Sequence, residues 1–199
     1  MTRLLIVGPQ GSGKGTQGVL VAERYGVPVV STGDIFRANI RQGTELGRKV
    51  QAITASGELV PDEVTSEIVR DRLAQDDAAG GFLLDGYPRN TAQVSHLDDF
   101  LSSVGATLDS VILLDVPRDE SISRIAKRAE LEGRADDTPD AIAKRLDIYE
   151  SETAPIVDVY DARGIVDRID GVGSLDEITS RIFEALAARG LEPVVASGQ

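Results

Sequence analysis

Five short runs of apolar residues recur along the chain, at Leu4–Val7, Val27–Val30, Phe82–Leu84, Ser110–Leu114 and Ile165–Ile169. None of them alternates cleanly between apolar and polar positions, so each predicts a strand that is buried on both faces. Segments with helical patterns separate the runs. This alternation predicts a doubly wound α/β fold, a three-layer sandwich in which a five-stranded parallel sheet carries helices on both faces.

The segments between the runs give the expected helices and their boundaries. Helices are predicted at 17–25, 33–41, 45–55, 61–76, 90–104, 117–131, 138–162 and 174–189. Pro61 suits a first helical position, and Thr138 suits an N-cap followed by proline in the first turn. Pro155 should kink or divide the long helix. Ser174 to Glu177 match a capping box.

Two segments interrupt the simple alternation of strands and helices. Residues 31–60 place short helices between the second and third strands, and residues 127–137 form a highly charged connection between two helices. Excursions of this kind are typical of binding loops and lids. We therefore expect one domain with a core of residues 1–30, 61–126 and 138–199 and with two functional insertions.

The stretch from Gly8 to Thr16 (GPQGSGKGT) directly follows the first predicted strand and precedes a helix. Glycines let successive backbone N–H groups point at a phosphate, and the helix N-terminus adds a partial positive charge. Lys14 supplies a full charge for the outer phosphates. The segment therefore predicts a phosphate-binding loop (P-loop) that handles a nucleoside triphosphate. Its Lys-Gly-Thr ending is the variant found in nucleoside monophosphate kinases.

Polar residues follow the second and third predicted strands, where ligands gather in this fold class. Asp85 ends the third strand and could hold Mg²⁺ directly or through water, while Arg89 could grip a phosphate with two hydrogen bonds. After the second strand, Thr32 could contact a base or cap the helix, and Arg37 lies about one turn further on. Each feature alone also fits an ordinary turn or a solvated surface.

Four arginines cluster around the second insertion. Arg124 and Arg128 share one helix face, Arg134 lies in the charged loop and Arg145 lies on the next helix. They could form a solvated surface paired with Glu130, Glu132 and Asp147. Gathered at a lid, they could instead neutralise the charge that develops on a transferred phosphoryl group.

Composition narrows the function further. The net charge is −12, with 33 acidic against 21 basic residues, which argues against nucleic-acid binding. No apolar run approaches a membrane span and no signal peptide is visible, so we expect a cytoplasmic protein without a membrane partner. With no cysteine and a single histidine, His96, thiolate zinc sites and histidine-based triads are excluded.

Several separated motifs resemble those of the adenylate kinases, the ATP:AMP phosphotransferases of the nucleoside monophosphate kinase family. They are GPQGSGKGTQ at 8–17, STGD at 31–34, GELVPD at 57–62, DGYPR at 85–89, RADD at 134–137 and IDG at 169–171. The resemblance implies reversible transfer of the terminal phosphoryl group of Mg·ATP to AMP, giving two ADP, in adenine nucleotide homeostasis and purine salvage. It also implies that residues 31–60 bind AMP and that residues 127–137 form a short lid, which has no cysteines for structural zinc. By resemblance the protein is expected to be a monomer.

The same resemblance assigns roles to individual residues. The ATP site would comprise Gly11, Ser12, Gly13, Lys14, Gly15, Thr16, Arg124, Arg128 and Gly173. The AMP site would comprise Thr32, Arg37, Glu58, Leu59, Val60, Gly86, Tyr87, Pro88, Arg89, Gln93, Arg134 and Arg145. The catalytic set would be Lys14, Arg89, Arg128, Arg134 and Arg145.

Three other interpretations remain open at this point. A pyrimidine monophosphate kinase shares the fold, but typically carries alanine and asparagine where this chain has Thr32 and Gln93. The run from Tyr87 to Asn90 has some similarity to that group. A nucleotide switch such as a small GTPase would need an Asn-Lys-x-Asp motif, which the sequence lacks. An acidic structural adaptor would require the phosphate loop to be accidental.

Overall fold

The structure is a computed structural model that describes residues 1–132 and 138–194, with backbone alone for residues 130–132. The strands are β1 (Thr2–Val7), β2 (Val29–Ser31), β3 (Gly81–Asp85), β4 (Ser110–Asp115) and β5 (Val166–Asp170). The helices are α1 (Lys14–Tyr25), α2 (Thr32–Gln42), α3 (Glu45–Ala55), α4 (Asp62–Leu73), α5 (Thr91–Ser103), α6 (Arg118–Glu132), α7 (Pro139–Ile148), α8 (Ala154–Asp161) and α9 (Leu175–Ala188). A short 3₁₀ helix, η1 (Asp76–Ala78), precedes β3, and a π-helical stretch, η2 (Tyr149–Thr153), joins α7 to α8.

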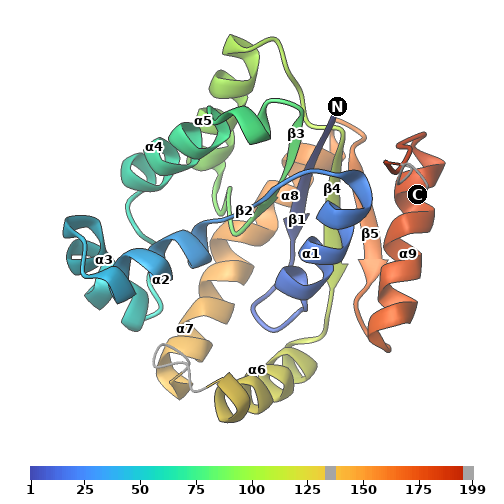
Figure 1. The fold of residues 1–199 in the computed structure, drawn as a ribbon. Coiled ribbons are helices and arrows are strands. Elements are labelled where there is room, and N and C mark those ends of the chain that lie inside the picture. The colour runs from blue at the N-terminus through green and yellow to red at the C-terminus, as the bar shows by residue number, and fades with distance from the viewer. Residues whose placement is uncertain (133–137, 195–199) are drawn as a thin grey trace, which may run out of the picture.

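In the described part of the chain the strands form one parallel sheet in the order β2-β3-β1-β4-β5. The predicted five-stranded parallel sheet is therefore confirmed. Helices cover both of its faces, with α1 and α9 on one side and α5 and α8 on the other (Figure 1). Because every strand runs the same way, all carboxyl ends lie along one edge of the sheet.

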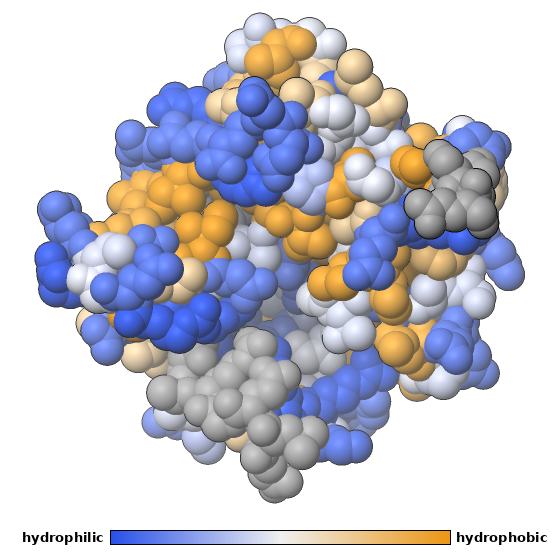
Figure 2. Space-filling view, in the orientation of Figure 1, coloured by the Kyte–Doolittle hydropathy of each residue, from blue (hydrophilic) through white to orange (hydrophobic). Residues whose placement is uncertain are grey.

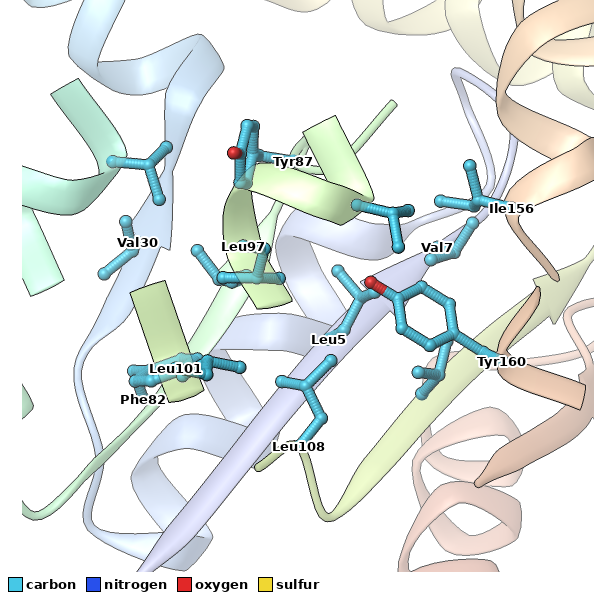
Figure 3. Packing of buried hydrophobic residues seen from close by; sticks show 14 of the residues in the cluster. Leu5, Val7, Val30, Phe82, Tyr87, Leu97, Leu101, Leu108, Ile156 and Tyr160 are labelled. Carbon is cyan, nitrogen blue, oxygen red and sulfur yellow. The ribbon is translucent and has the colours of Figure 1, made fainter. Parts of the chain in front are cut away.

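The alternation of side chains along β1 divides the core into two layers. Leu5 and Val7 pack with α5 and α8, and the ring of Tyr160 lies beside Leu5 (Figure 3). Leu4 and Ile6 point the other way and pack with α1 and α9. The glycine loop after Val7 therefore begins at the end of a strand that is packed against helices on both faces of the sheet.

The two edge strands differ from the sequence-based prediction. Burial on both faces holds for β1, β3 and β4, whose central residues are enclosed. In β5 Arg168 and Asp170 are exposed, and β2 buries only Val30 fully. The prediction was wrong there because an edge strand has a neighbour on one side only, and apolar runs do not reveal strand order.

Pro61 and Pro155 both lie at helix starts: the position predicted for Pro61 was wrong, whereas the predicted division of the long helix near Pro155 is confirmed. Pro61 is the N-cap of α4 rather than its first residue, and α4 ends at Leu73. The long helix predicted to Ala162 is interrupted already at Tyr149, where the chain widens into η2 before Pro155 enters the first turn of α8. Since Pro155 has no N–H, the helix cannot continue regularly through it.

Side-chain caps fix where several helices begin. Ser31, Thr44, Asn90, Thr138 and Ser174 each accept a hydrogen bond from the backbone N–H three residues later. The predicted caps at Thr138 and Ser174 are confirmed, the latter as a complete capping box. Three of the capped helices, α2, α5 and α9, follow β2, β3 and β5 and so begin near the carboxyl edge of the sheet.

The segment between β2 and β3 has an apolar cluster of its own. Phe36, Val50 and Val60 are buried together, with α2 and α3 projecting to the left of the sheet in Figure 1. This arrangement is compatible with the expected insertion at residues 31–60. That the segment moves as a unit stays a prediction.

Leu84→Ala is expected to lower the free energy of unfolding by about 2–5 kcal/mol, because Leu84 is fully buried in the central strand β3. Val104→Ala, at an exposed position after α5, is the matched control and should change it by less than about 0.5 kcal/mol. Urea unfolding of the nucleotide-free protein measures both. A loss below about 1 kcal/mol for Leu84→Ala would contradict the described core.

Candidate active site

A cavity of about 1090 Å³ opens along the carboxyl edge of the sheet. Its described walls come from the loop after β1, the start of α2, the turn after β3, and helices α6 and α7. In the space-filling view this face is hollowed near its centre, between the α2–α3 segment and α6 (Figure 2). Segments distant in sequence therefore converge on one concave site.

The glycine loop forms one end of the cavity. Gly13 is the N-cap of α1 with φ 91°, and no side chain caps the helix, so its first N–H groups have no side-chain acceptor. A Cβ at Gly11 would lie 2.6 Å from the carbonyl oxygen of Ser121 and 2.7 Å from Ile125. Glycine is thus required sterically at Gly11 and conformationally at Gly13. The resulting ring of N–H groups suits an anion.

Lys14 folds back over this loop. Its Nζ donates to the carbonyl oxygens of Gly8 at 2.8 Å and Pro9 at 3.0 Å. Burial lowers the pKa of Lys14 from 10.5 to about 8; Asp85 raises it, whereas Arg89 and Arg128 lower it further. The ammonium group is therefore held in a position where its charge is disfavoured unless an anion accompanies it.

Arg89 stands near the middle of the site. Its Nε donates to the carbonyl oxygen of Gly86 at 2.7 Å, and Thr153 Oγ1 donates to its backbone carbonyl at 2.7 Å. Burial lowers the pKa of Arg89, Asp85 raises it, and the nearby charges of Arg145 and Arg37 lower it. The charges of Arg37, Arg89 and Arg145 thus act on one another near the carboxylate of Asp85, and Arg37 is also paired with Asp34.

Among the described residues, three arginines reach the cavity from α6 and α7. Arg124 is tied by its Nε to Glu120 at 2.7 Å and by its Nη2 to the carbonyl oxygen of Gly171 at 3.0 Å. Arg128, one turn along α6, also lines the cavity. On α7, Arg145 Nη2 donates to the carbonyl oxygen of Thr54 at 2.9 Å. These contacts join α6 to the β5–α9 loop and α7 to the end of α3.

Thr32 begins α2 and lines the cavity. Of the two roles considered for it, capping is wrong, because Ser31 Oγ accepts the hydrogen bond from Asp34 N that caps this helix. Thr32 Oγ1 instead donates to the carbonyl oxygen of Gly86 at 2.9 Å. The start of α2 is thereby fastened to the turn after β3. Arg37 pairs with Asp34 at 2.7 Å.

Gln93 lies on α5 and is almost completely buried, yet it lines the cavity. Its Oε1 accepts from the backbone N–H of Arg89 at 2.8 Å, and its Nε2 donates to Asp62 Oδ1 at 2.7 Å. Asn90 Nδ2 donates to the same Asp62 oxygen at 2.9 Å. Sequence reasoning gave Asp62 and Asn90 no role in the site, although Asp62 closes the quoted motif at 57–62.

Asp85 lies at the end of β3, where it is paired in register with Ser31 of β2. It is half-buried and lines the cavity near Lys14. Within residues 1–132 and 138–194, no group of three or more acidic, histidine or cysteine side chains is placed to hold a metal ion. A cation at Asp85 would therefore need most of its ligands from water or from a bound phosphate.

The structure brings most of the predicted site residues to this cavity. Those lining it are Gly11, Gly13, Lys14, Gly15, Thr16, Thr32, Arg37, Glu58, Leu59, Val60, Asp85, Gly86, Tyr87, Pro88, Arg89, Gln93, Arg124, Arg128 and Arg145. Ser12 and Gly173 do not line it: Ser12 is buried beneath the loop, and Gly173 is exposed after β5. Arg134, with the predicted lid residues 133–137, lies outside the described residues.

The charge of the cavity is opposite to that of the chain. Its described walls carry seven basic and three acidic side chains, whereas the whole protein has a net charge of −12. The site is therefore a local concentration of positive charge that suits a polyanionic ligand. No helix within the described ranges is long and apolar enough to cross a membrane.

Comparison with known proteins identifies the family. Residues 6–165 match the family model for adenylate kinase. The chain is 59% identical to the adenylate kinase of Kocuria rhizophila over 186 residues, covering 94% of this chain and 99% of that protein. It is 55% identical to the adenylate kinase of Bifidobacterium longum, covering 92% and 99% of the two chains, and 51% identical to that of Clavibacter michiganensis over the full length of both. The chain therefore belongs to the adenylate kinase family and is a phosphotransferase that converts ATP and AMP into two molecules of ADP.

Proposed function

We propose that the cavity holds ATP at its glycine-loop end and AMP between α2, the turn after β3 and α5. The gathering of Lys14, Arg89, Arg128 and Arg145 around one space carries this proposal, because like charges near one another are unfavourable until an anion joins them. Two phosphate chains meeting end to end would provide that anion. Arg89, whose charge is felt by Lys14 and by the AMP-side arginines, lies where they would meet.

On the ATP side, the loop N–H groups and Lys14 would bind the outer phosphates. Arg128 would contact them from α6, and Arg124 would lie beside the adenosine. The role of Gly173 in adenine binding keeps only indirect support, since the neighbouring Gly171 holds Arg124 through its carbonyl. Ser12, buried beneath the loop, would act by shaping the backbone rather than by touching phosphate.

On the AMP side, Thr32 and Gln93 would contact the base, while Arg37 and Arg89 would hold the phosphate. The backbone of Glu58, Leu59 and Val60 would close over the nucleotide. Arg145 and, in the lid, Arg134 would reach toward the transferred group. The hydrogen bond from Arg145 to the carbonyl oxygen of Thr54, at the end of α3, supports a role for Arg145 at the boundary between the two halves.

The reaction needs no general base from the protein. The attacking AMP phosphate is already largely dianionic at neutral pH, because its second pKa is about 6. Catalysis then consists of aligning two phosphates and stabilising the charge that spreads over the transferred group. The protein supplies both through fixed N–H groups, Lys14 and the arginines. Closure of the lid would keep water from competing as the acceptor.

The residues present fit a magnesium ion that arrives with ATP. Mg²⁺ keeps several waters and needs one or two carboxylates besides phosphate oxygens, so the single carboxylate of Asp85 suffices. When bound, the ion would neutralise part of the phosphate charge. Asp85 would orient it through water. No structural zinc is proposed, since the chain has no cysteine.

We also propose that the protein works as a cytoplasmic monomer without nucleic-acid or membrane partners. The monomeric state is proposed from the resemblance to the short-lid adenylate kinases. The strongly negative net charge would repel nucleic acid and acidic lipid surfaces outside the cavity.

Lys14→Met is expected to lower kcat by about 10²–10³-fold, since it removes a charge placed against the transferred phosphoryl group. Lys49→Met is the matched control, because Lys49 is exposed, pairs with Glu45 and does not line the cavity. A coupled assay of ADP formation, with circular dichroism to verify folding, makes the comparison. Turnover close to wild type in folded Lys14→Met would reject the role of Lys14.

Nucleotide binding near pH 8 is expected to take up about half a proton. The pKa of Lys14 is about 8 in the free protein, so half of the amine is neutral at that pH, and a bound triphosphate raises the pKa toward its ordinary value. Affinity should therefore fall as pH rises above 8 and change little below pH 7. Calorimetry with a non-hydrolysable ATP analogue in buffers of different ionisation enthalpy measures the uptake.

Lys14→Arg is the control for this linkage, because a guanidinium stays charged throughout the range. It should show no such uptake. Equal proton uptake by Lys14→Arg and wild type would assign the titration to another group, and no uptake by wild type would contradict the buried state of Lys14.

A further inference from the structure

The side-chain amide of Gln93 makes two hydrogen bonds: its oxygen accepts one from a donor, and its nitrogen donates one to an acceptor. A backbone N–H can only donate, so the contact with Arg89 N at 2.8 Å must be made by Oε1. A carboxylate oxygen accepts, so the contact with Asp62 Oδ1 at 2.7 Å must be made by Nε2. Turning the amide over would bring donor against donor and acceptor against acceptor. Its orientation is therefore dictated by its neighbours.

Asp62 is itself anchored. Its Oδ1 accepts a second hydrogen bond from Asn90 Nδ2 at 2.9 Å, and Asn90 Oδ1 accepts from the backbone N–H of Gln93 at 2.9 Å. Asn90 is therefore also held by one donor and one acceptor. The three side chains form a closed network between the first turns of α4 and α5, in which no amide can turn over without breaking two bonds.

This network leaves one donor and one acceptor of Gln93 for the cavity. A carboxamide has two N–H donors and two lone pairs, and one of each is used behind the cavity wall. The remaining N–H and lone pair lie on a buried side chain that lines the cavity. They present a donor and an acceptor in a fixed order to any ring that lies against them.

Purine bases differ in the order of these groups. Adenine offers the N1 acceptor beside the 6-amino donor, whereas hypoxanthine and guanine offer an N1–H donor beside the 6-oxo acceptor. An amide fixed in one orientation can pair with the first pattern and must clash electrostatically with the second. An amide free to turn over could accommodate either.

We propose that Asp62 is a specificity-determining positioning residue, which fixes the amide of Gln93 so that the AMP site accepts adenine and rejects 6-oxopurines. The proposal rests on the proposed function of Gln93 as a base-contacting residue. Asp62 does not itself line the cavity, so it acts only through Gln93. Replacing it frees one end of the amide and weakens discrimination more than it weakens the fold.

The test compares AMP with inosine monophosphate, which differs from AMP only at the groups that Gln93 would contact. The quantity measured is the ratio of kcat/KM for the two acceptors, with Mg·ATP as the donor. Asp62→Ala is expected to lower this ratio by about tenfold or more, because it removes a charged hydrogen-bond acceptor. Asp62→Asn keeps the shape of the side chain, but its amide can present either its oxygen or its NH₂ group to Gln93. This variant should lower the AMP to inosine monophosphate ratio by about threefold or more.

Glu63→Gln is the matched control. Glu63 is the next residue, an exposed acid that shares the first turn of α4, so its replacement removes the same charge from the same helix end. It should leave the ratio unchanged. A purely structural role of Asp62 would lower both kcat/KM values together, and the ratio would stay at the wild-type value. Thermal unfolding verifies that each variant is folded. If Asp62→Ala does not fold, the ratio measured for Asp62→Asn alone tests the proposal.

Gln93→Leu separates failure of this proposal from failure of the proposed function. If Gln93→Leu collapses the ratio while both Asp62 variants stay within twofold of wild type, the positioning role of Asp62 is rejected and the base-contacting role of Gln93 survives. If Gln93→Leu leaves both the AMP kinetics and the ratio unchanged, Gln93 does not contact the base, and the proposal falls with it.

Discussion

Several positive charges lie close together in one cavity of an acidic protein. The positions of the loops and helices around that cavity follow from the need to hold these charges there. Burial is the main cause that lowers the pKa of Lys14; Asp85 raises it, and repulsion from the charges of Arg89 and Arg128 lowers it further. Arginines from α2, α6 and α7 also line this cavity. The fold must hold them together against that repulsion. Backbone carbonyls of Gly8, Gly86, Gly171 and Thr54 hold Lys14, Arg89, Arg124 and Arg145, and the carboxylates of Asp34 and Glu120 pair with Arg37 and Arg124. The cations are thus held in fixed positions around the cavity.

The sheet makes this arrangement possible. Three central strands are enclosed by helices on both faces, so the loops that follow them start from fixed points along one edge. The Thr32 segment after β2 and the turn after β3 contact each other through the bond from Thr32 to Gly86, and the glycine loop after β1 lines the same cavity. The helices α6 and α7 add their arginines from beyond the edge. The sheet therefore forms one side of the site, and segments that extend beyond the sheet edge form the other.

Much of this could be predicted from the sequence, because periodicity and short motifs are local signals. All five strands, the caps at Thr138 and Ser174 and the phosphate loop follow from residues close together in the chain. Strand order does not, and so the exposed faces of β5 were missed. Ser31, not Thr32, caps α2, since either residue type can do so and only the backbone decides. The bonds of Asp62 to Asn90 and Gln93 join α4 to α5, so they depend on how two distant segments pack and could not be predicted from local signals.

ADP formation from Mg·ATP with AMP, CMP, UMP, GMP or no acceptor, measured in parallel, tests the central claim most directly. A cationic cavity alone would align any two phosphates, whereas Thr32 and Gln93 at its AMP end would restrict the acceptor to adenine. The account predicts fast turnover with AMP alone. Faster turnover with CMP or UMP would keep the phosphate chemistry but contradict the assignment of the base-contacting residues. ATP consumption that is indifferent to every monophosphate would contradict phosphoryl transfer between two bound nucleotides.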